Sequence, residues 1–143
     1  MIELQELIKP IWGTEKWLHN AWDILENHEK LIIKQRLDEM FYNGLPFQLE
    51  HNKILYIHLF SLLLQLEIFG LQGLLKSLEK LAGNVLQDKL RQQIIDEIFH
   101  AIVFAKITYQ LSSPYALPPT YNKNIEKFTY LLVNEPDLKT SLY

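Results

Sequence analysis

The chain has 143 residues, 48% of them hydrophobic and 22% charged, so it can bury the core of one domain and is too short for two ordinary ones. Its 14 basic and 17 acidic residues give a net charge of −3 without charge blocks, which speaks against nucleic acid or an anionic membrane as a partner. It lacks cysteine, which excludes disulfides and thiolate chemistry, and it shows no secretory signal pattern, so we expect a cytoplasmic protein.

Helical periodicity runs through nearly the whole sequence and predicts one all-α domain over residues 1–143. The first 47 residues should hold two helices, over 14–27 with Thr14 as N-cap and over 29–42. Asn-Gly-Leu-Pro at 43–46 should end the second helix, because glycine accepts the left-handed conformation and proline cannot continue a helix.

Residues 48–111 are predicted to form a long helical hairpin. A helix of more than 30 residues is expected over 48–82, and a second over 85–111. The Gly-Asn pair at 83–84 offers a tight stop between them, so the two helices should run antiparallel.

The first hairpin helix is almost wholly apolar over 54–66, which raises the question of a membrane span. Such a span needs about 20 apolar residues, and extending this segment brings in His58, Gln65 and Glu67. We therefore predict the central helix of a bundle and no membrane partner.

The remaining residues, 112–143, should form a strap and short helices. Three prolines within 114–119 forbid a helix and favour an extended chain. A short amphipathic helix is expected over 122–133, and another could begin at Pro136.

Three side chains of the hairpin are candidate metal ligands. Glu67 lies on a stripe of leucines, where a carboxylate is costly unless it is paired, protonated or bound to a metal. On the other helix, Glu97 and His100 stand three residues apart and so share one face. If the chain turns at 82–84, all three lie at one height, roughly 24 Å from the turn.

A structural explanation stands beside the metal one. Glu-x-x-His arises by chance in many helical proteins, and a buried Glu67 can instead pair with Lys106, Arg91 or a tyrosine hydroxyl. His28-Glu29 lacks the second histidine of a zinc motif and is expected to be a solvated helix start. The tryptophans recur every five residues, which does not fit one helical face, so we expect core and edge packing, with a partner surface as the alternative.

Several segments together resemble the N-terminal half of the ferritin-like di-iron oxygenases related to p-aminobenzoate N-oxygenase. These are YNGLPFQL at 42–49, the long helix bearing Glu67, IDEIFHA at 95–101 and LPP at 117–119. The resemblance implies half of a four-helix bundle that binds two irons, or manganese, and activates O2 to oxidise a small molecule. It also implies Glu67 as a terminal or bridging ligand, Glu97 as a bridging carboxylate and His100 as a terminal imidazole.

The sequence departs from that family by ending at residue 143, before a second helix pair, and no further Glu-x-x-His follows residue 112. One interpretation is a homodimer, in which two copies of Glu67, Glu97 and His100 rebuild the full ligand set of an oxygenase or ferroxidase. The alternative is a metal-free or inactive half-length remnant that serves as an interaction or structural domain.

Overall fold

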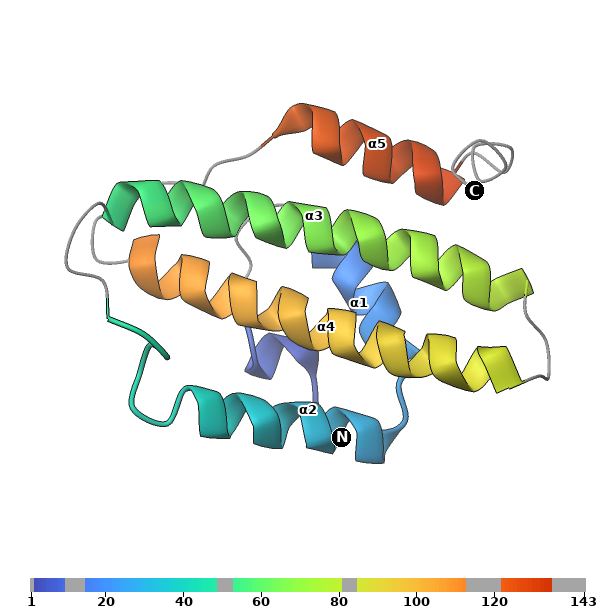
Figure 1. The fold of residues 1–143 in the computed structure, drawn as a ribbon, viewed down its shortest axis with the longest axis horizontal. Coiled ribbons are helices and arrows are strands. Elements are labelled where there is room, and N and C mark those ends of the chain that lie inside the picture. The colour runs from blue at the N-terminus through green and yellow to red at the C-terminus, as the bar shows by residue number, and fades with distance from the viewer. Residues whose placement is uncertain (1, 10–14, 49–52, 81–84, 113–121, 135–143) are drawn as a thin grey trace.

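The computed structural model describes residues 2–9, 15–48, 53–80, 85–112 and 122–134. Over these residues the regular structure is helical and contains no strand, which confirms the all-α prediction. The elements, shown in Figure 1, are η1 (Leu4–Glu6), α1 (Glu15–Asp23), α2 (Asn27–Met40), α3 (Lys53–Lys80), α4 (Val85–Ser112) and α5 (Lys123–Asn134). The predicted cap Thr14, the turn at 82–84, the strap at 113–119 and the last helix from Pro136 lie outside the described residues.

The helix boundaries near the N-terminus differ from those predicted. Helix α1 ends at Asp23, and α2 begins at Asn27, because the Glu29 carboxylate accepts the backbone N–H of Glu26 at 2.8 Å and so fixes the start of α2. At its other end α2 stops at Met40, and Gly44 takes the predicted left-handed conformation with φ of 91°. Gln48, predicted to open the long helix, lies outside it.

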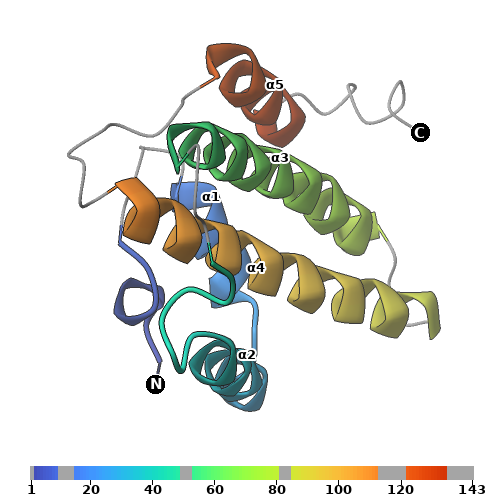
Figure 2. The same cartoon turned by 60° about the vertical axis from the view of Figure 1, so that its left-hand side comes forward.

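Helices α3 and α4 run side by side and antiparallel, as the hairpin prediction required (Figures 1 and 2). Helices α1 and α2 pack behind and below this pair, and α5 lies along α3 on the other side (Figure 2). The core lies between these layers, with α3 and α4 contributing a row each of fully or almost fully buried side chains: Ile57, Leu64, Ile68, Leu71, Ile94, Ile98, Ile102 and Ala105.

The N-terminal helices are tied to the hairpin by their tryptophans and by one ion pair. Trp17 and Trp22 are buried, as expected, and the Trp22 ring N–H donates to the Ile2 carbonyl at 3.1 Å. Arg91 on α4 contacts the Glu29 carboxylate at 2.6 Å. Burial disfavours the Glu29 carboxylate, but the Arg91 hydrogen bond outweighs burial and holds the pKa of Glu29 below its usual value. Glu29 is thus buried and paired, which corrects the expectation of a solvated helix start for this residue, whereas His28 is exposed as expected.

Helix α5 is anchored to α3 through Gln65. The Gln65 amide accepts the backbone N–H of Asn122 at 2.9 Å and donates to the Asn122 carbonyl at 3.3 Å. The Asn122 side chain in turn accepts the backbone N–H groups of Asn124 and Ile125, which caps the first turn of α5. This polar link explains why a glutamine is tolerated at a buried position of an otherwise apolar helix.

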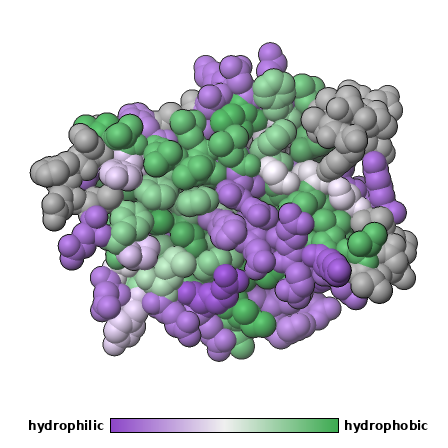
Figure 3. Space-filling view, in the orientation of Figure 1, coloured by the Kyte–Doolittle hydropathy of each residue, from purple (hydrophilic) through white to green (hydrophobic). Residues whose placement is uncertain are grey.

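One side of α3, which faces away from α1, α4 and α5, is not covered by the described residues. Within the described residues, α3 alone is long and apolar enough to cross a membrane by length and composition, and 33% of its most apolar window is buried. The exposed part of α3 includes three leucines, Leu55 at 62%, Leu59 at 45% and Leu66 at 50% exposure. Figure 3 shows hydrophobic surface over the region where α3 begins, next to hydrophilic surface over the middle of the molecule.

Candidate metal centre

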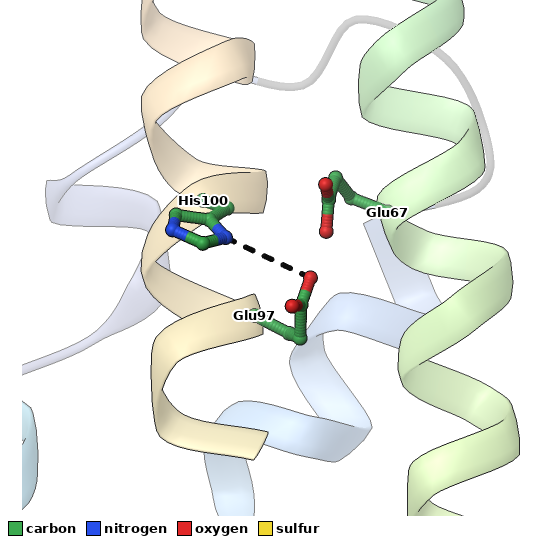
Figure 4. Close-up of side chains that lie close together, drawn as sticks. All are labelled: Glu67, Glu97 and His100. Carbon is green, nitrogen blue, oxygen red and sulfur yellow. Dashed lines mark ion pairs between the residues drawn. The ribbon is translucent and has the colours of Figure 1, made fainter. Parts of the chain in front are cut away.

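The structure brings Glu67, Glu97 and His100 together. Glu67 projects from α3, whereas Glu97 and His100 project from α4 one turn apart, and the three side chains face the space between the helices (Figure 4). One donor atom from each residue lies within 4.8 Å of the others, and His100 Nδ1 is 3.7 Å from a Glu97 oxygen. The antiparallel pairing of α3 and α4 therefore puts the three residues at one height, as the residue spacing predicted.

The three side chains differ in exposure, which sets where a ligand can approach. The Glu97 side chain is 27% exposed and that of His100 47%, while Glu67 is half-buried. On α3, the neighbouring positions Leu66 and Gly70 are exposed as well. The site therefore lies at the base of an open face and is not enclosed by the described residues.

The surroundings of Glu67 raise the pKa of its carboxyl strongly. Burial raises its pKa to about 8 from a usual value of 4.5, and both the hydrogen bond with Glu97 and the charge of Glu97 add to the rise. Two carboxyls whose oxygens lie within 4.8 Å of each other cannot both be ionised without cost, so near neutral pH the pair holds one proton between them. A divalent cation placed between them would displace that proton.

The cationic partners suggested for Glu67 are engaged elsewhere. Arg91 donates to Glu29 and to the Ile24 carbonyl. Lys106 donates to the Leu7 carbonyl at 3.4 Å and lies 5.2 Å from the centre of the Phe41 ring. Among the described residues, the ion pairs include no lysine or arginine on Glu67, so Glu67 lacks the cationic partner that the structural explanation required, and His100 alone pairs with Glu97.

A cluster of aromatic rings lies one to two helical turns away from the donors. Phe60 is two turns before Glu67, and Phe104 is one turn after His100, with ring centroids 5.9 Å apart. Phe47 stacks on Phe60 at 5.6 Å, and Tyr56 does so at 6.3 Å. The helical spacing placed Phe60 and Phe104 on the donor side, but nothing in the sequence indicated that Phe47, from the loop after α2, would join them.

The donor chemistry fits a hard or borderline divalent metal. Two carboxylates and one imidazole are the ligand types that iron and manganese take in ferritin-like bundles. A complete di-metal centre of that kind uses four carboxylates and two imidazoles, which is twice the number of each donor type found here.

No protein-family model, curated protein or solved structure matches this chain. The resemblance to the di-iron oxygenases therefore stays a prediction, and the chemistry of the site rests on its own geometry.

Arg36 is a further residue near the site that the sequence did not single out. Its guanidinium lies 3.9 Å from the centre of the Phe99 ring and 3.5 Å from Asp96, which fixes α2 against the part of α4 that bears the donors. Phe99 and Asp96 both neighbour Glu97 or His100 in sequence. Arg36 therefore holds the backbone of the site from outside, without reaching the donors.

Proposed function

We propose that the chain supplies half of a di-metal centre, which two identical chains complete, and that this centre serves an O2-dependent oxidation of a small molecule. The observation that carries the proposal is the meeting of Glu67, Glu97 and His100 at one height, with neither Arg91 nor Lys106 paired to Glu67. Placing a carboxyl pair that shares a proton between two long helices costs free energy, and helix packing alone does not require such a pair.

In this proposal Glu97 bridges the two metals, His100 is a terminal ligand and Glu67 is a terminal or bridging ligand. Two ferrous ions so held would give two of the four electrons that reduction of O2 to water requires, and the small molecule that is oxidised would give the other two. Manganese is the second metal that suits these donors. The chain itself would perform three tasks. Glu67 would release its proton when a metal ion binds, and α3 and α4 would hold the three donors in place. The Phe60 and Phe104 rings would limit access of water along the helices.

A second function is favoured by one feature of the site. The Glu67 carboxyl already has a hydrogen-bond partner in Glu97, so it does not need a metal ion to have a polar partner. On this alternative the chain is a metal-free helical domain that serves in protein interaction, and the donors are a remnant.

Alanine variants at the donors distinguish the two functions. Purified wild type should retain iron or manganese, and Glu67→Ala and His100→Ala should each lose it while keeping the helix content and native mass of wild type. Glu79→Ala, an exposed carboxylate on the same helix, is the matched control and should retain the metal. Equal metal content in all four proteins, or none in wild type, would leave the metal-free domain as the function.

The oxidative chemistry is tested separately by O2 uptake. Wild type loaded anaerobically with Fe(II) should consume O2 faster than the same concentration of free Fe(II), and His100→Ala should not. Uptake at the rate of free Fe(II) would restrict the site to metal binding.

A further inference from the structure

The open face of the hairpin is defined by exposed positions on the side opposite the core. On α3 these are Leu55, Leu59, Leu66 and Gly70, which recur at helical spacing opposite the buried row. On α4 they include Asp96 and His100, one turn apart. The face is therefore apolar along α3 and polar along α4, with the metal donors in the seam between the two helices.

A second copy of the chain fits this face for a reason specific to the site. The donor set is half of a di-metal set, so the partner must bring the same three donors, and an identical chain does so through a two-fold axis. The donors of both chains can meet only if the axis passes at the height of Glu67. This step rests on the proposed function.

Two arrangements satisfy such an axis. In one, α3 packs on the partner's α4, which would bury the exposed ion pair of Asp96 and Arg36 against the leucines, at a cost in desolvation. In the other, α3 packs on the partner's α3, and leucines meet leucines. The second arrangement buries apolar surface on both sides, and its axis, perpendicular to α3, makes the two α3 helices antiparallel.

The height of the axis then fixes where the two α3 helices cross. Leu66 and Gly70 are the exposed positions on either side of Glu67, so the crossing lies at these residues. A Cβ added at Gly70 would meet nothing within 4 Å, so the backbone here is open to close approach by another helix.

We infer that a second copy docks on the open face with its α3 antiparallel to α3 of the first, crossing at Leu66 and Gly70 and completing the ligand set. Packed helices lie about 8–10 Å apart, which brings facing Cα atoms at the crossing within the range that a disulfide spans. Leu55 lies twelve residues from the axis height, so its two copies would be about 36 Å apart.

Because the chain lacks cysteine, single introduced cysteines report this contact without background. Leu66→Cys, one residue from the axis height, should run as a covalent dimer on a non-reducing gel after mild oxidation with diamide, and Leu55→Cys, at another exposed leucine of the same helix, should remain a monomer. The inference is overturned if Leu66→Cys does not cross-link, or if Leu55→Cys cross-links as fully as Leu66→Cys does. A wild-type monomer that sediments with phosphatidylcholine vesicles would overturn it too, since lipid would then cover the leucines.

The metal content of the same samples separates this inference from the proposed function. A cross-linked dimer without metal would uphold the docking and refute the metal centre. A metal-loaded dimer whose cysteines do not cross-link would uphold the metal centre and refute this docking.

Discussion

Replacing Glu67 by glutamine in the metal-free protein should make the chain more stable at alkaline pH. Glutamine is the neutral counterpart of protonated glutamate and keeps a group that can hydrogen-bond Glu97. The folded-state pKa of Glu67, about 8, exceeds its unfolded value of 4.5, so the folded chain holds the Glu67 proton more tightly. The stability from this group is therefore fully present below pH 4.5 and is lost as the pH rises to about 8.

The size of the effect follows from the same two values. A pKa difference of this size corresponds to at most about 5 kcal/mol, and the partial exposure of the site reduces this to roughly 2 kcal/mol. We expect Glu67→Gln to match wild type near pH 5 and to exceed its free energy of unfolding by roughly 2 kcal/mol at pH 9.

Urea unfolding in the presence of EDTA, followed by circular dichroism from pH 5 to pH 9, measures this difference. Glu79→Gln on the same helix controls for the loss of one negative charge from the exposed surface. If the difference between wild type and Glu67→Gln stays constant over this pH range, the two carboxyls do not share a proton, and the electrostatic description of the site is wrong.

Three further outcomes follow from the structure. Mn(II) binding to wild type should release protons at pH 7, seen by calorimetry as a heat that depends on the buffer, whereas Glu67→Gln should release fewer; equal heats would contradict the shared proton. His100→Ala should weaken Mn(II) binding at least tenfold, by about 1.4 kcal/mol or more, with the unfolding midpoint of the metal-free protein unchanged, because His100 is 47% exposed. Arg91→Ala should lower the free energy of unfolding by about 2 kcal/mol, since it leaves Glu29 buried without its partner, and should leave metal content unchanged; a loss of metal would show that this ion pair supports the site directly.

The long-range features of the fold could be predicted from periodicity and residue counting. Glu67, Glu97 and His100 were placed at one height from the position of a two-residue turn alone, because a straight helix converts residue number directly into length. The α3 and α4 helices are long enough that errors of a few residues at their ends do not move their middles.

Local features that depend on tertiary contacts could not be predicted in this way. The start of α2 at Asn27 depends on Glu29, which Arg91 reaches from another helix 62 positions away in the chain. Phe47 joins the rings beside the donors because the loop after α2 folds back over α3, and no helical pattern signals a loop contact. Sequence spacing shows which side chains share a helix face, but it does not show which other segment covers that face.

Native mass spectrometry of wild type loaded anaerobically with Fe(II) or Mn(II) tests most directly whether two chains share a metal centre. We expect a dimer that carries two metal ions, and a dimer without metal from the Glu67→Ala variant. A wild-type monomer that retains no metal under these conditions would contradict the proposal.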